Sequence, residues 1–361
     1  MGKIRYLHII NILLVALFTG IGFMMGYAVA EEKTTEGEHA PAHHTMNGFR
    51  NIYQNPEHGF MSLLRWKLGL GPNETPAISN ARKIPYVPDI AAPNYQQIYS
   101  PDPEKIQITW IGHSTFLIQV EGVNILTDPI FKGSSSPFLG LGPKRLSPPG
   151  IPFDRLPPID AVLQSHNHYD HLDLYTVKKL GNKPKYFVPL KLGQWFHDQK
   201  ITNYVEMDWW DASMFKGIRI VSVPIQHFSR RSINDGNKTL WAGWVLETKR
   251  GKIFFAGDTG YSPHFREIRD KLGPMRLALL PIGAYQPRWL MKTMHMDPPD
   301  AVSAHNDLQA EQSIGIHWGT FKLTDEPLGE PPVYLKKIIK EASMREDSFL
   351  VMKFGETRIF E

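Results

Sequence analysis

The chain has 361 residues, of which 42% are hydrophobic and 21% charged, enough for a large domain with a sizeable core. Its 40 basic and 36 acidic residues give a net charge of +4, and there is no long basic run, so nucleic acid is not an expected partner. Cysteine is absent, which excludes disulfides, thiolate metal sites and cysteine nucleophiles. A transition-metal site would therefore need imidazole and carboxylate ligands, and the sequence contains 15 histidines.

Residues 1–30 have the pattern of an export segment. Two basic residues precede the apolar run IINILLVALFTGIGFMMGYAVA, which ends on the small-residue triplet Ala-Val-Ala. We expect a signal peptide. A retained membrane anchor stays open as the alternative, because roughly 20 apolar residues can span a bilayer. In either case the rest of the chain is expected outside the cytoplasm, in the periplasm or anchored facing it.

Two segments of low regularity follow. Residues 31–48 are polar and predict a disordered linker, in which His39, His43 and His44 could hold a metal ion loosely. Residues 49–105 are rich in Pro, Asn and Gly and predict an N-terminal extension packed on the domain. Its amphipathic patch FMSLLRWKLGL could also meet a membrane surface, although packing on the domain is the favoured interpretation.

From residue 106 to 361 the pattern predicts one α/β domain. Gly181 is expected to end one helix and Asp297 to cap the start of another. Because strands first come in runs and then alternate with helices, we predict an αββα sandwich, two mixed β-sheets flanked by helices. The expected strands are 108–112, 114–122, 123–128, 160–164, 185–190, 204–208, 218–228, 240–248, 251–260, 277–283 and 313–319, and the expected helices are 174–181, 191–199, 262–273, 297–309 and 331–346.

The stretch SHNHYDHLD carries the main functional signal. It follows the apolar strand DAVLQ, so its residues emerge at a strand end, where functional sites collect. His166 and His168 are two positions apart and can face the same way, whereas Asp170 and His171 come after a turn. Four ligand-type residues in six positions favour a pair of metal ions over a hydrogen-bonded surface loop.

Three further candidates also end apolar strands. His227 follows IVSVPIQ, Asp258 follows KIFFAG and His317 follows SIGI. A carboxylate has two oxygens and can lie between two ions, so Asp258 is the candidate bridge. The predicted ligand sets are His166, His168, His227 and Asp258 for the first ion, and Asp170, His171, Asp258 and His317 for the second.

These motifs resemble a known family. HNHYDH matches the HxHxDH signature of the metallo-β-lactamase fold, and the later His, Asp and His come in that fold's usual order. The stretches WIGHSTFLIQVEGVNILTDPIF, FAGDTGYS, PIGAYQPRWLMK, HMDPPDAV and IHWGTFKLTDEP are similar to the N-acyl-phosphatidylethanolamine-hydrolysing phospholipase D branch. The resemblance implies two zinc ions and release of an N-acylethanolamine and phosphatidic acid. Related branches that use manganese leave Mn²⁺ open. Tyr169 and His295 match substrate-contacting positions of the branch.

The expected chemistry follows from these roles. Two ions would hold a bridging hydroxide that attacks phosphorus. Asp258 and Asp170 are the catalytic carboxylates, one bridging the ions and one orienting the hydroxide. Asp128 and His113 are expected to steady the ligand histidines, with a satisfied buried histidine as the alternative for His113. His295 could donate to a phosphate oxygen.

A phospholipid substrate and a membrane surface are the expected partners. Aromatic and apolar side chains could line an acyl groove, although such residues are more often core. The alternative function is a metallohydrolase of the same fold that acts on a soluble phosphodiester, ester or lactone. A binding protein that kept the fold is less compatible with seven intact ligands, and the sequence does not predict the oligomeric state. The groove candidates are Trp195, Phe196, Trp209, Trp210, Met214, Phe215, Trp289, Leu290 and Met291, and the candidates for a basic rim are Arg230, Arg231, Arg288 and Lys292.

Overall fold

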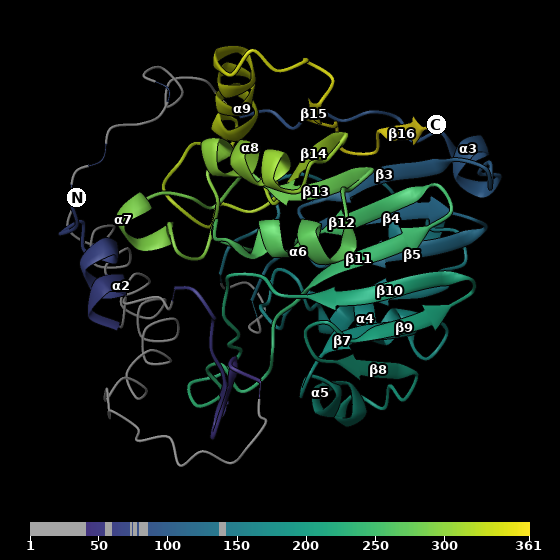
Figure 1. Ribbon diagram of the computed structural model, residues 1–361. Helices are drawn as coiled ribbons and strands as arrows, with labels where there is room; N and C mark the ends of the chain where they lie inside the picture. The colour runs from purple at the N-terminus through teal and green to yellow at the C-terminus, as the bar shows by residue number, and fades with distance from the viewer. Residues whose placement is uncertain (1–40, 55–59, 73, 75–77, 79–85, 137–141) are drawn as a thin grey trace, which may run out of the picture.

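Two seven-stranded mixed β-sheets form the centre of the molecule (Figure 1). In spatial order, the first sheet consists of β16 (Thr357–Phe360), β3 (Ile106–Gly112), β4 (Thr115–Val120), β5 (Val123–Thr127), β6 (Ala161–Leu163), β7 (Lys185–Pro189) and β8 (Tyr204–Met207). The second consists of β15 (Phe349–Leu350), β14 (Gln312–Ile316), β13 (Leu277–Pro281), β12 (Gly251–Phe255), β11 (Gly243–Thr248), β10 (Ile218–Val223) and β9 (Ala212–Phe215).

Helices cover the outer faces of both sheets, which confirms the predicted αββα sandwich (Figure 1). The largest core cluster joins inward-facing side chains of both sheets, such as Trp110 and Trp244. A second cluster joins the first sheet to α4 and α5. The helices are α2 (Phe60–Lys67), α3 (Tyr95–Tyr99), α4 (Leu174–Leu180), α5 (Gly193–Asp198), α6 (His264–Leu272), α7 (Arg288–Met291), α8 (Pro298–Asp307) and α9 (Glu330–Glu341), with a 3₁₀ turn at Phe153–Arg155.

The predicted helix ends are confirmed. Gly181 ends α4 with φ of 62°, a conformation that glycine adopts at little cost. Asp297 caps α8, where its side chain accepts a hydrogen bond from the backbone N–H of Asp300 and a proline occupies the first turn.

The computed structural model describes residues 41–54, 60–72, 74, 78, 86–136 and 142–361. The predicted export segment and residues 31–40 of the predicted linker lie outside these residues. Among the residues described, no helix is long and apolar enough to cross a bilayer.

The prediction of a disordered linker is wrong for residues 41–48. A short hairpin, β1 (His44–Thr45) and β2 (Gly48–Phe49), packs on the domain. Phe49 belongs to the main core, and His43 is only 5% exposed. The segment is ordered because its histidines bond to the partly exposed carboxylate of Asp208, a distant partner that its own sequence could not indicate.

The parallel part of each sheet positions the candidate site. β5 and β6 run parallel, with Thr127 opposite Leu163, so the residues after both strands emerge together. β12, β13 and β14 are also parallel, and the chain leaves β12 toward Asp258 and β14 toward His317. Since the carboxyl ends of parallel strands share one edge of a sheet, residues far apart in sequence meet there.

Candidate metal centre

Three imidazole rings converge beside the end of β6. His166 Nε2 lies 2.8 Å from His168 Nδ1, and His227 Nε2 lies 3.2 Å from the same atom. His166 and His227 are fully buried, whereas His168 is partly exposed. The structure thus brings together the three histidines predicted for the first ion, with one nitrogen of each ring directed to a common point.

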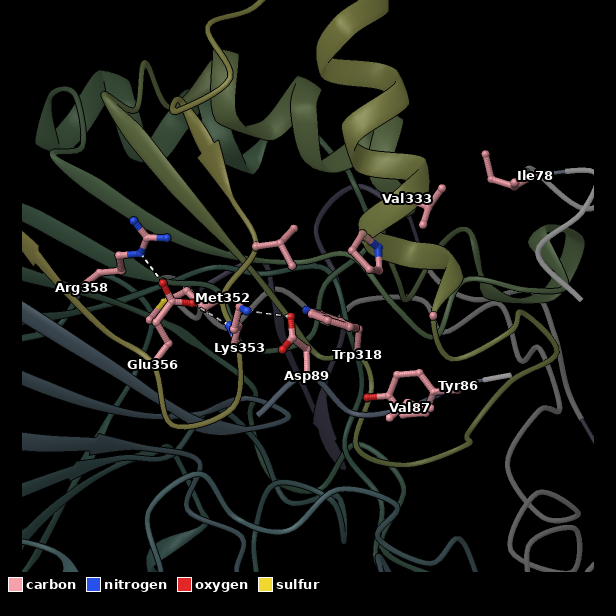
Figure 2. Close-up of a pocket in the computed structure, with 13 residues that line it drawn as sticks. Ile78, Tyr86, Val87, Asp89, Trp318, Val333, Met352, Lys353, Glu356 and Arg358 are labelled. Carbon is pink, nitrogen blue, oxygen red and sulfur yellow. Dashed lines mark hydrogen bonds and ion pairs between the residues drawn. The ribbon is translucent and has the colours of Figure 1, made fainter. Parts of the chain in front are cut away.

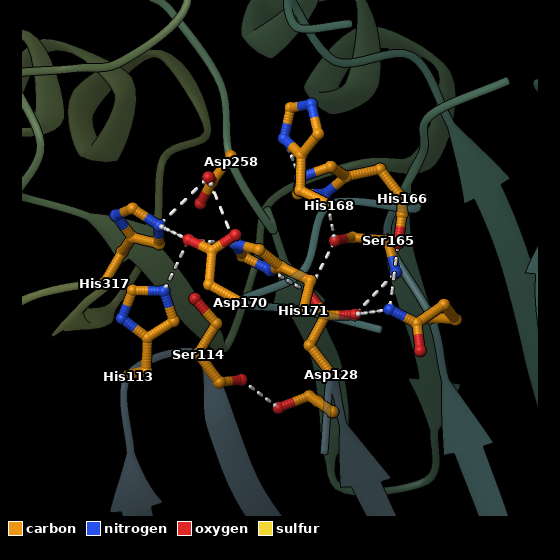
Figure 3. Close-up of polar contacts among 12 residues, drawn as sticks. His113, Ser114, Asp128, Ser165, His166, His168, Asp170, His171, Asp258 and His317 are labelled. Atoms are coloured by element: carbon orange, nitrogen blue, oxygen red, sulfur yellow. Dashed lines mark hydrogen bonds and ion pairs between the residues drawn. The ribbon is translucent and has the colours of Figure 1, made fainter. Parts of the chain in front are cut away.

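A second group lies beside the first (Figure 3). His317 Nε2 is 3.5 Å and His171 Nε2 is 3.7 Å from Asp170 Oδ2. His113, which the sequence assigned a supporting role, also points its Nε2 at this carboxylate, at 3.1 Å. His113 therefore lies close enough to serve as a ligand as well as a support.

Asp258 lies between the two groups. Its Oδ2 is 3.0 Å from His317 Nε2 and 3.1 Å from His171 Nε2 in the second group, and 3.9 Å from His227 Nε2 in the first. Its other oxygen, Oδ1, is buried and has no hydrogen-bond partner within the described part of the chain. This is the position that a bridging carboxylate requires.

Hydrogen bonds to the far sides of the rings set the direction of their lone pairs. His171 Nδ1–H donates to Asp128 Oδ2 at 2.6 Å, and His227 Nδ1–H donates to the carbonyl of Met294 at 3.0 Å. Ser165 donates its hydroxyl hydrogen to Asp128, so its oxygen can accept from His166 Nδ1–H at 2.8 Å. Each of these rings therefore directs its Nε2 to the site, and this atom can bind a metal ion once it carries no proton.

The backbone is strained where it turns into the site. His113, Asp128 and His317 have positive φ values of 55°, 33° and 61°, which non-glycine residues seldom adopt. Gly257 shares this conformation with φ of 61°, and a Cβ there would lie 2.5 Å from the Cβ of Ser165. These turns direct side chains from separate strand ends toward one centre. At position 257 the chain lies so close to Ser165 that only glycine fits.

Burial and mutual charge shift the titration of the whole cluster. Burial lowers the pKa of His168 and His227 to about 3. Burial opposes the charge on His317, but the carboxylate of Asp258 outweighs it and raises the pKa of His317 to about 9. For Asp258, burial would raise the pKa, yet the charges on His171 and His317 hold it well below its usual range. At neutral pH the carboxylate of Asp258 is therefore ionised and His168 and His227 are neutral, the states that metal ligands need, whereas His317 would release its proton to bind an ion.

The donor set fits two divalent metal ions. Ligand atoms about 2.1 Å from a tetrahedral ion lie ~3.4 Å apart, close to the separations between these nitrogens and oxygens. The buried Asp258 Oδ1 and His317 Nδ1 lack protein hydrogen bonds within the described residues, which an ion and its ordered water would supply. Imidazole with carboxylate suits zinc and also manganese.

Tyr169 is placed differently from the expectation. Its hydroxyl donates to the backbone carbonyl of Arg231 at 2.8 Å, and the Arg231 guanidinium lies 4.0 Å from its ring centroid. Arg231 in turn donates to the carbonyls of Asn167 and Leu172. Together these two side chains hold the loop that carries the candidate ligands. The contacts favour a positioning role for Tyr169 over contact with a lipid headgroup. They also favour a positioning role for Arg231 over a place in a basic rim.

His295 lies at the open side of the cluster. Its Nδ1 is 3.9 Å from Asp258 Oδ2 and has no hydrogen-bond partner among the described residues. Arg288 donates to the backbone carbonyl of His295 at 2.9 Å and pairs with Asp297 and Asp300. Arg288 therefore holds His295 in place instead of forming a solvated rim, and the imidazole remains able to donate to a substrate oxygen.

A small apolar cluster borders the metal centre. Leu290, Met291 and Met294 pack with Trp66, Phe228 and Trp289, separately from the main core. The ring of Phe228 lies 4.4 Å from that of His168, so the cluster reaches the first histidine group. Among the other groove candidates, Phe196 and Trp209 are core residues, whereas Met214 is exposed.

A cavity of about 380 Å³ lies beside Trp318, the residue after His317 (Figure 2). Its charged lining residues are paired with each other, Lys353 with Asp89 and Arg358 with Glu356. In the described part of the chain, no residue that lines this cavity belongs to a group of side chains that could hold a metal ion.

Two residues that support the centre carry no distinctive signal in the sequence. Ser165 is the first residue of the stretch SHNHYDHLD, and its role depends on Asp128, which follows another strand. Asn51 donates to the carbonyl of His227 at 2.8 Å and accepts from its N–H at 3.2 Å, although 176 positions separate them. Neither residue type is distinctive, so only spatial proximity reveals these roles.

Comparison with known proteins agrees with this fold and site. Residues 123–318 match the family described as β-lactamase superfamily domain, which is more than half of the chain. A metallo-hydrolase from Ignicoccus hospitalis (Igni18) has a similar structure, with a TM-score of 0.55 and 23% identity, covering 71% of this chain and 99% of its own. An isothiocyanate hydrolase from Delia radicum gut bacteria gives a TM-score of 0.57 at 21% identity, covering 70% and 99%. The fold and the site define a metal-dependent hydrolase of the β-lactamase superfamily.

Sequence relatives narrow this class. N-acyl-phosphatidylethanolamine-hydrolyzing phospholipase D 1 of Caenorhabditis elegans is 40% identical over 263 residues, which cover 69% of this chain and 74% of the worm protein. The mitochondrial protein of the same description from Saccharomyces cerevisiae is 35% identical over 266 residues, covering 70% of this chain and 56% of the yeast protein. The chain belongs to the N-acyl-phosphatidylethanolamine-hydrolysing phospholipase D branch of the superfamily.

Proposed function

We propose that the protein is a zinc-dependent phosphodiesterase that hydrolyses N-acylphosphatidylethanolamine to N-acylethanolamine and phosphatidic acid. The observation that carries the proposal is the position of Asp258 between two groups of metal-type donors. Similarity to two proteins named for this reaction supports the substrate class.

In an in-line displacement at phosphorus, different residues of this chain have different roles. Two ions held by the two donor groups would lower the pKa of a water molecule toward ~7 and neutralise phosphate oxygens. Asp170 orients that water, and the partly exposed His168 and His295 border the space open to the phosphate. A bond forms between the water oxygen and phosphorus while the bond from phosphorus to the ethanolamine oxygen breaks, and the proton that the attacking water loses ends on the ethanolamine oxygen. His295 donates to a phosphate oxygen.

The apolar cluster supports a lipid substrate. The partly exposed Phe228 and Trp289 offer hydrocarbon surface on this cluster, and Phe228 contacts His168, so an acyl chain would lie there when its phosphodiester reaches the ions. Burial of acyl methylenes stabilises the complex by about 0.8 kcal/mol each, so a long chain can contribute most of the binding free energy.

A comparison of two substrates tests the proposal. Purified protein loaded with Zn²⁺ is given N-acylphosphatidylethanolamine in mixed micelles or bis(4-nitrophenyl) phosphate in solution. We expect release of phosphatidic acid at a rate far above that of the soluble diester. Turnover of the soluble diester alone would contradict the lipid assignment and favour the alternative, a hydrolase of soluble phosphodiesters or esters.

We also propose that the domain acts at a membrane surface outside the cytoplasm. The basic start and apolar run of residues 1–30 support export. Fusion of alkaline phosphatase to the C-terminus tests it, because that reporter is active only after export. An inactive but full-length fusion would contradict the proposal.

A further inference from the structure

A separate cluster of metal-type side chains lies on the N-terminal segment. His43 Nε2 is 2.6 Å from Asp208 Oδ1, and His44 Nε2 is 2.7 Å from Asp208 Oδ2. The histidines come from the hairpin of residues 41–49, and Asp208 follows β8. None of the three residues belongs to the metal centre described above.

A turn before β1 brings the two histidines together. His43 lies in that turn and His44 is the first residue of β1, so their side chains are not held on opposite faces and both rings reach a single carboxylate. The rings meet edge to face with centroids 4.5 Å apart, and His43 stacks on Trp209 at 4.2 Å. The backbone N–H of Trp209 donates to Asp208 Oδ1 at 2.8 Å, which fixes the carboxylate. The three ligand-type side chains are therefore preorganised.

We propose that His43, His44 and Asp208 form a third metal site, which binds a divalent ion of the zinc class and has a structural role. Two imidazoles and one carboxylate are donors that zinc accepts, and water can complete a tetrahedron. The side chains of His44 and Asp208 are 28% and 19% exposed, so water can reach the open position.

Only a small movement separates this hydrogen-bonded arrangement from a metal site. The nitrogen-to-oxygen distances of 2.6 and 2.7 Å would widen to ~3.4 Å around a tetrahedral ion, a movement within the reach of side-chain rotation. His166 and His168 of the metal centre show the same close approach, with 2.8 Å between their ring nitrogens. Asp211 adds negative charge, since its carboxylate accepts from the Asp208 backbone N–H at 2.8 Å.

A metal ion bound at this site would hold in place the segment that supports His227. Residues 41–54 carry Asn51, whose side chain bonds both the N–H and the carbonyl of His227. An ion that ties His43 and His44 to Asp208 would hold this segment on the domain without contacting substrate. The proposal concerns a site outside the metal centre and does not depend on the proposed reaction.

Metal counting tests the site. The full chain is saturated with Zn²⁺, passed through gel filtration with a weak chelator, and analysed by mass spectrometry of the metal. We expect His44→Gln and Asp208→Asn each to hold one zinc ion per chain fewer than the parent. His197→Gln is the matched control, because His197 is exposed on α5 and belongs to no metal-type group of the described residues.

The same difference of one ion is expected when the substitutions are made in an Asp258→Asn background, which separates this site from the metal centre. Circular dichroism checks that each variant is folded. Equal zinc content in the parent, His44→Gln and Asp208→Asn would overturn the proposal. The proposal would also be overturned if the folded variants lost thermal stability with no change in zinc content. In that case the three side chains would stabilise the segment through hydrogen bonds alone.

Discussion

His171 donates its Nδ1–H to the carboxylate of Asp128 at 2.6 Å, and both side chains are completely buried. Asp128 also accepts hydrogen bonds from the backbone N–H and the hydroxyl of Ser165, and Ser165 in turn supports His166. One carboxylate therefore orients ligands of both histidine groups. This relationship links the two halves of the centre more tightly than the ligand motif itself indicates.

Asp128→Asn should weaken metal binding by about 10–100-fold, because a neutral amide cannot hold the His171 tautomer or raise its basicity as a carboxylate does. The left-handed backbone at position 128 suits asparagine, so the variant should fold. Zinc affinity measured against a fluorescent chelator checks this. Asp154→Asn serves as the control, since that side chain is 83% exposed. Unchanged affinity in Asp128→Asn would remove the supporting role.

The chelated protein should lose stability as pH rises from about 6.5 to 9. In the native state the pKa of His317 is raised to about 9 and that of His171 also lies well above its usual value, whereas both titrate near 6.5 when unfolded. The native state therefore binds more protons in this range, and its stability falls as they leave. Thermal unfolding in excess chelator measures it. A midpoint that rises between pH 6.5 and 9 would contradict the assigned shifts.

Asn51→Ala should destabilise the fold by about 2 kcal/mol and reduce turnover. The substitution leaves the His227 N–H and carbonyl without their buried partner, and the indole N–H of Trp241 keeps only the Ile225 carbonyl of its two acceptors. Urea unfolding gives the free-energy change, and steady-state kinetics give kcat and KM. Asn306→Ala, exposed on α8, is the control. A fall in stability with unaltered kcat would show that Asn51 supports only the fold.

Trp289→Ala should raise KM for long-chain lipid about 10-fold and leave turnover of a soluble phosphodiester unchanged. Loss of an aromatic contact from the apolar cluster removes binding surface for the acyl chain and leaves the metal ligands in place. The ratio of kcat/KM values for N-acyl chains of increasing length is the measurement. An equal loss of kcat/KM on the lipid and on the soluble phosphodiester would indicate that the substitution disturbs the structure of the metal centre.

The sequence indicated much of this arrangement for a physical reason. His166, His168, Asp170 and His171 are neighbours, so their motif alone predicts a site. His227, Asp258 and His317 could be added because each follows an apolar strand, and the parallel strands β12 to β14 carry two of them to one edge. The predicted sandwich is confirmed for the same reason, since alternating strands and helices determine the layers.

Other features depend on long-range contacts that no local pattern encodes. β16, at the C-terminal end of the chain, pairs with β3, the first strand of the predicted α/β domain. Asn51 contacts His227 from a segment that the sequence predicts to be an N-terminal extension. The hydroxyl of Tyr169 donates to the backbone carbonyl of Arg231, a partner 62 residues away, which the motif around Tyr169 could not indicate. Ser165 remained unnoticed because serine is common before any turn.

The origin of the oxygen added to the product tests the central claim most directly. The zinc-loaded protein hydrolyses N-acylphosphatidylethanolamine in water enriched in ¹⁸O, with Asp258→Asn as the inactive comparison. If water activated at this centre attacks phosphorus, one ¹⁸O atom appears in phosphatidic acid and none in the N-acylethanolamine. Label in a released fatty acid, or equal phosphatidic acid production by Asp258→Asn, would contradict the account.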